Sequence, residues 1–377
     1  MDPRQQLEHL SGKNLLRTLS PGESKNLRIA RDGRELWNFS SNDYLGLSHH
    51  PAIAAAFTEG IAKFGTGSAA SRLVTGTSHA HTALEESIAA AKHSQAALTF
   101  SSGYATALSA IPVIAGKGDF VLLDKLAHAS LIDAARMSAA TLRVFSHNDT
   151  EKLAKLLYTL RSKHPAARLL VVTESIFSMD GDLCPLREIL DLCELHGAQL
   201  LLDEAHALGV LGSTGMGLAE QLGVQDRVHF QMGTLSKALG LSGGYLAASR
   251  DWIALIINRA RPFIYTTAPS PALALAALAA LDLVRSAEGK VLREKLFQNI
   301  SLLRPYHPSA ILPIIIGDNQ AALNASAALV AKGFLAPAIR YPTVPRNTAR
   351  LRITLSAGHP EDAVKSLAAY LPESGTC

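Results

Sequence analysis

The chain has 377 residues, which is more than one hydrophobic core usually supports, so we expect two domains. Its 36 Lys and Arg residues against 32 Asp and Glu residues give a net charge of +4, which does not indicate nucleic-acid binding but leaves anionic small molecules possible. The three cysteines form no Cys-x-x-Cys pair and the N-terminus has no apolar signal segment, so we expect a reduced, cytoplasmic protein. The longest apolar run, residues 271–284, is too short to cross a bilayer.

Three parts are expected along the chain: an N-terminal arm over residues 1–45, a large domain over 46–265 and a small α+β domain over 266–377. In the large domain, short apolar strands alternate with amphipathic helices. The strands are expected at residues 96–100, 120–123, 142–145, 169–173 and 199–202. Such alternation predicts an α/β fold whose central sheet is mainly parallel and is covered by helices on both faces.

The last part of the chain mixes helices with isolated strands. A long Ala- and Leu-rich helix is expected from about residue 268, and it offers apolar surface for a domain or dimer interface. Strands are expected at residues 311–316 and 350–354, with helices at 320–332 and after Pro360.

Polar residues follow four of the strands expected in the large domain. In open α/β sheets, ligands bind in the crevice beyond the carboxyl ends of the strands. The residues at these strand ends are Ser102, Gly103, His128, Ser178, Asp203 and His206. The run Ser101-Ser102-Gly103-Tyr104 also opens a helix, where free backbone N–H groups suit the binding of an anion. We therefore expect one site at this edge of the sheet.

Lys237 lies in a loop of small residues with no charged neighbour between Arg227 and Arg250. A lysine must be neutral to condense with a carbonyl, and such surroundings favour the neutral amine. Upstream, Asp203 closes an apolar strand, where its carboxylate could hold a cofactor ring nitrogen protonated. The pair indicates an enzyme that uses pyridoxal 5'-phosphate.

Two other chemistries fit the sequence less well. Asp203-Glu-Ala-His206 also spells a helicase motif, but that ATPase needs a Gly-x-x-x-x-Gly-Lys-Ser/Thr loop, and the chain contains none. The histidines His79 and His81 lack the companions that a closed metal site needs, so no metal is predicted.

Several motifs together resemble those of the α-oxoamine synthases, and the resemblance covers nearly the whole chain. These are fold-type I pyridoxal-phosphate enzymes that condense an amino acid with an acyl thioester and release carbon dioxide. The motifs lie at residues 38–51, 71–78, 174–182, 203–206 and 234–237. One departure is Thr234-Leu-Ser-Lys237, which replaces the more familiar Thr-Phe-Gly-Lys.

The resemblance implies roles for individual residues around the cofactor. Lys237 is the Schiff-base lysine and takes the substrate proton, Asp203 pairs with the ring nitrogen, and His128 stacks on the ring. Thr266 or Thr267 reaches the phosphate bound by the partner subunit. The other implied cofactor contacts, to the phosphate or the phenolic oxygen, are Ser102, Gly103, Tyr104, Ser178, His206 and Thr234.

Further roles concern the substrates. Arg352 is implied as the clamp for the amino-acid carboxylate, because the planar guanidinium pairs with a carboxylate at two points. Arg17 resembles an arginine near the acyl substrate. The other residues implied in substrate binding are Asn42, His128, Thr354 and Ser356.

The resemblance implies a cytoplasmic homodimer that joins L-alanine to a pimeloyl thioester, carried by CoA or by an acyl carrier protein. A sister enzyme that uses glycine stays open, since one methyl group in a pocket is worth only about 1–3 kcal/mol of discrimination. A catalytically silent subunit of an acyltransferase assembly is a third possibility. The presence of Lys237, Asp203 and His206 argues against it.

Overall fold

The computed structural model describes residues 2–371, which form two compact units. The large unit comprises residues 47–178 and 182–293, and the small unit combines the described residues 2–46, 179–181 and 294–371. Within the described residues, no helix is both long enough and apolar enough to cross a membrane.

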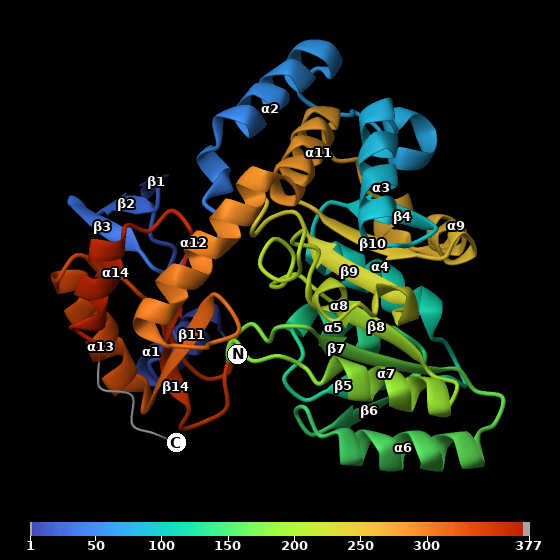
Figure 1. The fold of residues 1–377 in the computed structure, drawn as a ribbon. Helices are drawn as coiled ribbons and strands as arrows, with labels where there is room; N and C mark the ends of the chain where they lie inside the picture. The colour runs from blue at the N-terminus through green and yellow to red at the C-terminus, as the bar shows by residue number, and fades with distance from the viewer. Residues whose placement is uncertain (1, 372–377) are drawn as a thin grey trace. The chain divides into compact units, whose positions relative to one another are not determined.

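A seven-stranded sheet forms the centre of the large unit (Figure 1). Its order is β4 (Ala96–Phe100), β10 (Gly244–Ala248), β9 (Phe230–Thr234), β8 (Gln199–Asp203), β7 (Leu169–Glu174), β5 (Phe120–Asp124) and β6 (Thr141–Phe145). Strand β10 is antiparallel to both of its neighbours, and the other pairings are parallel. The mainly parallel sheet expected from the sequence is confirmed.

Helices cover this sheet on both faces, so its central strands are buried along their whole length. One face packs against α4 (Gly103–Ile114), α5 (Ala129–Met137) and α9 (Arg250–Arg259). Figure 1 shows α6 (Thr150–Lys163) and α7 (Leu186–Leu195) on the other side. Burial on both faces explains why the strands read as continuous apolar runs.

The large unit extends beyond the boundary expected at residue 265. Helix α11 (Pro271–Arg285) packs against α2 (Pro51–Phe64) and α3 (His79–Ala91). A Cβ at Gly60 would lie 2.6 Å from Cα of Ala272, so glycine is what allows α2 and α11 to approach so closely. The Ala- and Leu-rich helix therefore belongs to the large unit, whereas the sequence pattern placed it in the small domain.

Short helical segments complete the large unit. They are η1 (Leu47–His49), η2 (Arg72–Gly76), α8 (Leu218–Gln221), η3 (Gln225–Arg227) and α10 (Arg261–Ile264). Helix α12 (Ala287–Leu303) begins in the large unit and continues into the small one.

The small unit contains two sheets. One has the order β1 (Glu23–Lys25), β2 (Arg28–Arg31), β3 (Arg34–Asn38) and β12 (Phe334–Leu335), and the other has the order β11 (Ile311–Gly317), β14 (Ala349–Thr354) and β13 (Ala338–Ile339). Its helices are α1 (Pro3–Gly12), α13 (Asn319–Ala331) and α14 (Glu361–Ala368). Because β3 pairs with β12, the N-terminal segment is part of this unit, whereas the sequence pattern set it apart as an arm.

Candidate active site

A cavity of about 220 Å³ lies in the large unit, where β4, β5, β7, β8 and β9 end. The residues that line it are Ser102, Gly103, Tyr104, His128, Ser130, Glu174, Asp203, Ala205, His206, Met232, Thr234, Ser236 and Lys237. The structure thus brings eight residues predicted from the sequence to one cavity.

Lys237 and His206 contact each other across this cavity. Lys237 follows β9 and His206 follows β8, and these two strands are paired in parallel. The Nζ atom of Lys237 lies 2.8 Å from Nε2 of His206. The neighbouring strand ends therefore hold the amine in a fixed position, within hydrogen-bond distance of a group that can exchange a proton with it.

Two buried carboxyl groups lie beside Lys237. Asp203 and Glu174 occupy paired positions at the ends of β8 and β7. Burial raises the pKa of both groups, and the positive charge of Lys237 acts in the opposite direction. Oδ1 of Asp203 accepts a hydrogen bond from the backbone N–H of Ala205 at 2.9 Å. A cation held next to these groups would favour their ionised form, so the site suits a protonated ring nitrogen.

His128 is fixed at the start of α5. Its Nδ1 accepts a hydrogen bond from the backbone N–H of Ser130 at 3.2 Å and lies 2.8 Å from Oγ of the same serine. The backbone N–H of His128 donates to Glu174 Oε1 at 2.5 Å. Burial lowers the pKa of His128, which favours a neutral imidazole. A neutral, oriented ring can lie against a flat aromatic ligand.

Another part of the cavity lining can bind an anion. Ser102 caps α4, and its Oγ accepts a hydrogen bond from Ala105 N at 3.0 Å. The N–H groups of Gly103 and Tyr104, in the first turn, have no intrahelical acceptor. Thr234 Oγ1 lies 2.7 Å from Ser236 Oγ. Amide groups at a helix start, next to hydroxyls, fit a phosphate group, so this donor set suits pyridoxal phosphate.

Three residues implied as cofactor contacts do not line this cavity. Ser178 is buried in the loop after β7. Thr266 and Thr267 follow α10, and Thr267 forms a β-bridge with Ser71. Tyr104 does line the cavity, although the residue is 42% exposed and its hydroxyl donates to Asp133.

Four residues implied in substrate binding lie in the small unit, around β14. The Nη2 atom of Arg352 donates to Asn42 Oδ1 at 3.1 Å. The hydroxyl of Thr354 donates to the carbonyl of Phe39, and that of Ser356 donates to the carbonyl of Asp43. The structure therefore groups Asn42, Arg352, Thr354 and Ser356.

Arg17, the fifth residue implied in substrate binding within this unit, lies elsewhere. It is exposed, and its Nη2 donates to Thr343 Oγ1 at 3.0 Å.

The sequence patterns missed several residues of the cavity. Glu174, Ser130, Ala205, Met232 and Ser236 line it without having been predicted. The available signal for Glu174 was its place at the end of an apolar strand, as for Asp203. Its position beside Asp203 depends on the register of β7 and β8, which the sequence does not reveal.

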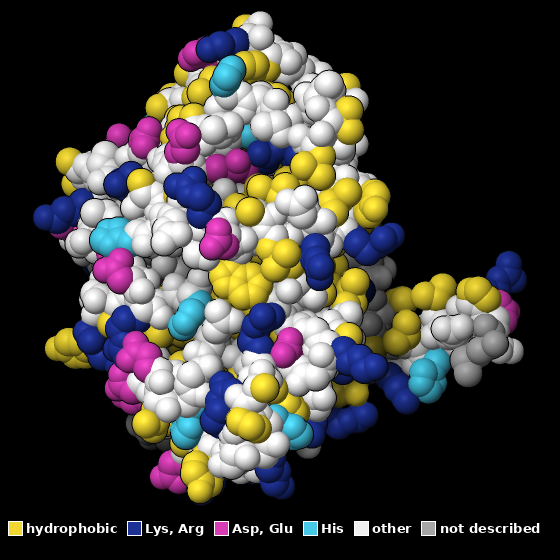
Figure 2. All heavy atoms as spheres, turned by 90° about the vertical axis from the view of Figure 1, so that its right-hand side faces the viewer, with side chains coloured by type: hydrophobic (Ala, Val, Ile, Leu, Met, Phe, Trp, Pro, Cys, Tyr) yellow, Lys and Arg dark blue, Asp and Glu magenta, His cyan; other side chains and the backbone are white. Residues whose placement is uncertain are grey.

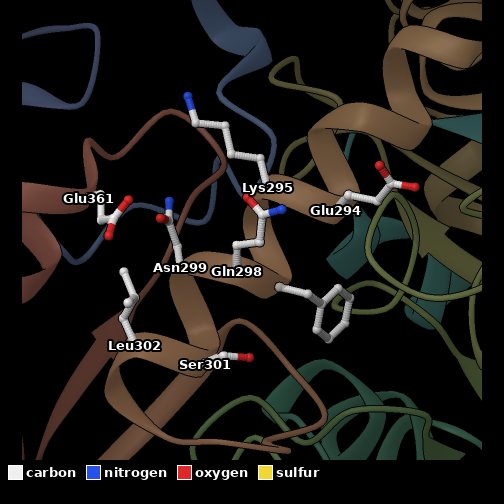
Figure 3. A pocket seen from close by; sticks show the side chains of 8 residues that line it. Glu294, Lys295, Gln298, Asn299, Ser301, Leu302 and Glu361 are labelled. Atoms are coloured by element: carbon white, nitrogen blue, oxygen red, sulfur yellow. The ribbon is translucent and has the colours of Figure 1, made fainter.

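A larger hollow, of about 730 Å³, lies on the small unit (Figure 3). Its lining residues are Glu294, Lys295, Phe297, Gln298, Asn299, Ser301, Leu302 and Glu361. Figure 3 shows most of them on one helix, α12, with Glu361 approaching from another element. This lining contains no imidazole beside its lysine, so the chemistry favours the smaller cavity around Lys237.

The chain is similar to known proteins over nearly its whole length. Residues 34–371 match the family described as Aminotransferase class I and II. The chain belongs to this family. It is 43% identical over 381 residues to 8-amino-7-oxononanoate synthase of Geobacter sulfurreducens, covering 98% of this chain and 97% of that one. It is 48% identical over 350 residues to that of Maricaulis maris, covering 91% and 88%.

Solved structures show the same fold. Serine palmitoyltransferase from S. paucimobilis has a TM-score of 0.91 at 28% identity, covering 98% of this chain and 95% of that one. The 8-amino-7-oxononanoate synthase of Francisella tularensis has a TM-score of 0.75 at 26% identity, covering 89% and 96%. The expected fold-type I architecture and the resemblance to α-oxoamine synthases are confirmed. The chain is a pyridoxal-phosphate-dependent acyltransferase.

Proposed function

We propose that the protein condenses L-alanine with a pimeloyl thioester to give 8-amino-7-oxononanoate, carbon dioxide and free thiol, in biotin biosynthesis. A carbon–carbon bond forms between the alanine Cα and the thioester carbonyl as the carbon–sulfur bond breaks. The bond to the alanine carboxylate then breaks and carbon dioxide leaves. The observation that carries the proposal is the contact of Lys237 with His206 beside Asp203, in a chain 43–48% identical to enzymes of that name.

The cavity residues supply the groups that this reaction needs. When bound through its aldehyde, pyridoxal phosphate would supply an electron sink for the alanine Cα. Lys237 would hold the aldehyde and, once the amine of alanine has displaced it, would move the α-proton, with His206 at 2.8 Å from its amine. Asp203 would supply the negative charge for a protonated ring nitrogen, and His128 would support the ring.

Two further groups bind the ends of the ligands. The N-terminus of α4, with Thr234, binds the phosphate. The guanidinium of Arg352 pairs with the alanine carboxylate, and Asn42 orients that guanidinium through the contact at 3.1 Å.

The active enzyme is proposed to be a homodimer. Large hydrophobic side chains of the large unit are exposed on η2 and after α10, among them Leu73, Val74 and Tyr265. The bridge between Ser71 and Thr267 joins these two segments into one surface. On the face that Figure 2 shows, groups of hydrophobic side chains lie between charged ones. An exposed apolar patch of this kind supports an interface between subunits, with Thr266 and Thr267 beside it.

The test of the proposed function is a comparison of amino acids. The purified holoenzyme is mixed with pimeloyl thioester and with alanine, glycine or serine, and the products are identified by mass spectrometry. We expect kcat/KM for alanine to be at least tenfold higher than for the other two. A preference for glycine would assign the chain to the sister activity, and no turnover with any of the three would remove the proposal.

A further inference from the structure

The interior of the large unit holds a pair of opposite charges to which the proposed reaction assigns no role. Lys92, the residue that ends α3, donates through Nζ to Oε2 of Glu204, and the two side chains are 1% and 0% exposed. The residues on either side of Glu204 in the chain, Asp203 and Ala205, line the cavity around Lys237. The buried pair therefore lies directly next to the candidate active site.

The two groups are an ammonium and a carboxylate rather than a neutral pair. Burial opposes the charge on Lys92, but the contacts with Glu204 and Tyr245 together outweigh it and raise the pKa of the ammonium. The ring centre of Tyr245 lies 5.9 Å from Nζ of Lys92. Lys92 thus keeps its charge in the protein interior.

Stability alone does not explain an ion pair in this position. Two charges that leave water lose their hydration, and apolar side chains of similar volume often stabilise an interior as well or better. This pair has further partners that fix its direction. Nζ of Lys92 also donates to the carbonyl of Met216 at 2.6 Å, and Oε1 of Glu204 accepts from the backbone N–H of Ala219 at 3.0 Å. Such a set of contacts specifies one geometry.

The loop before α8 is shaped around the Glu204 carboxylate. Gly217 has a φ of 105°, and a Cβ at this position would lie 2.5 Å from Oε1 of Glu204. Glycine is therefore what allows the loop to approach the carboxylate so closely. Met216 and Ala219, which bind the pair, lie on either side of this glycine. The loop thus fixes the position of the carboxylate.

Glu204 lies in the turn that carries two residues of the site. Asp203 precedes it, and His206 follows two positions later, with Nε2 at 2.8 Å from Nζ of Lys237. The backbone N–H of Glu204 donates to the carbonyl of Met232 in β9 at 2.8 Å, and its carbonyl accepts from two N–H groups later in the turn, at 3.0 and 2.9 Å. Because this turn is short and hydrogen-bonded, a shift of the Glu204 side chain would displace both of its neighbours.

Lys92 is also bound to β9. Its backbone carbonyl accepts from Nε2 of Gln231 at 2.8 Å, and Gln231 precedes Met232 in that strand. Strand β9 then leads to Lys237. The ion pair therefore joins two segments that are each hydrogen-bonded to the strand before Lys237.

We propose that Lys92 and Glu204 are positioning residues of the active site. Their ion pair fixes the turn of Asp203 and His206, and so sets the distance from His206 to the amine of Lys237. The same contact holds the Asp203 carboxylate where the cofactor ring nitrogen would bind. This inference rests on the proposed function, in which Asp203 and Lys237 act on the cofactor. Small displacements of such groups lower a rate strongly.

The experiment separates positioning from stability. The test variant is Lys92→Met/Glu204→Gln, which removes both charges at similar volume and leaves no buried charge without its partner. The control is Arg227→Met/Glu194→Gln, which removes an ion pair near the surface of the same unit. The Tm of each apoenzyme measures stability. A pH titration of the cofactor absorbance, without substrate, follows the proton on the nitrogen that joins the cofactor to Lys237.

We expect the Tm of both variants to stay within about 5 °C of the wild type. In the test variant alone, the midpoint of the absorbance titration should fall by about 1 pH unit, because a carboxylate that lies farther away favours the protonated form less. The pair has no net charge, so its removal does not cause this shift directly. A preserved Tm with an unchanged midpoint would show a purely structural pair and would overturn the proposal.

Two further measurements complete the test. The kcat of the test variant should fall by about tenfold or more, while KM for alanine stays within about threefold, since the turn does not bind the alanine carboxylate. If the test variant does not fold, Glu204→Asp decides, because it keeps the charge but shortens the side chain by one methylene. We expect its midpoint to fall as well, and a wild-type midpoint would overturn the proposal. Absence of product from the wild type would refute the proposed function alone, because the absorbance titration needs no substrate.

Discussion

The Nζ atom of Lys237 lies 2.8 Å from Nε2 of His206. The two residues follow β9 and β8, whose parallel pairing sets the distance between them. The two nitrogens share a hydrogen bond, so one of them must act as the acceptor. His206 can therefore receive a proton from Lys237 or return one to it, and this defines the chemical centre of the site.

Asp203→Asn should leave the cofactor bound but lower turnover at least 100-fold. The amide has the size of the carboxylate but cannot hold a proton on the ring nitrogen by charge, and each ~1.4 kcal/mol of lost stabilisation costs tenfold in rate. Steady-state rates and cofactor absorbance measure the two effects. The exposed Asp226→Asn serves as the control. Turnover near the wild-type rate in Asp203→Asn would show that a group other than Asp203 keeps the ring nitrogen protonated.

Arg352→Ala should raise the Kd for alanine about 10- to 100-fold, since hydrogen bonds to a charged group are worth about 1.5–3 kcal/mol. The Kd of Arg352→Lys for alanine should lie between those of the wild type and of Arg352→Ala, because lysine keeps the charge but lacks the planar guanidinium. Titration of cofactor absorbance with alanine gives the Kd of each variant. A Kd that both variants leave unchanged would place the carboxylate clamp elsewhere.

Val74→Lys should turn the dimer into a monomer of 40.0 kDa with much lower activity. Val74 is 75% exposed on η2, in the hydrophobic surface that we assign to the subunit interface. Leu195 on α7 is also 75% exposed, so Leu195→Lys is a matched control that should remain dimeric. Light scattering measures the mass. A wild-type protein that is monomeric and fully active would rule out a shared site.

His359 should make the stability of the protein depend on pH below 6.5. Burial lowers its pKa to about 4, while Nδ1 accepts from Ser356 N at 3.0 Å and Nε2 lies 3.2 Å from the carbonyl of Asn38. Between pH 6.5 and about 4, the His359 imidazole binds a proton in the unfolded chain but stays neutral in the folded chain. The neutral imidazole of His359 therefore contributes to the free energy of unfolding above pH 6.5. This contribution, about 3 kcal/mol, is lost as the pH falls through about 4.

Thermal unfolding from pH 7 to pH 4 measures this effect. His359→Asn removes the titrating group, so its Tm should fall less steeply than that of the wild type, although it starts lower. Parallel curves for the two proteins would mean that His359 does not contribute to the acid sensitivity.

The elements of the large unit could largely be predicted from the sequence, because each buried strand is a short apolar run between amphipathic helices. The direction of strand β10 and the position of helix α11 could not be predicted. Strand β10, Gly244–Ala248, consists mainly of small residues and is antiparallel to both of its neighbours. No local sequence pattern encodes the direction of a strand. The place of α11 depends on its contact with α2, where Gly60 meets Ala272, and an Ala- and Leu-rich helix does not specify its partner.

Some residues of the candidate site could likewise be predicted from the sequence, and others could not. Residues at or directly after strand ends, such as Asp203 and His128, could be predicted because ligands bind at the carboxyl ends of the strands of a parallel sheet. The position of Glu174 next to Asp203 depends on strand register. The contact of Arg352 with Asn42 joins residues 310 positions apart, and only the folded small unit brings them together.

The central claim is that Lys237 binds the cofactor, and borohydride reduction tests it most directly. Reduction fixes the cofactor to the lysine that holds its aldehyde, and digestion with mass spectrometry identifies that lysine. We predict that the pyridoxyl group is found on Lys237, and that Lys237→Ala incorporates none and has no turnover while its Tm is preserved. The group on any other lysine of the wild-type protein would contradict the account.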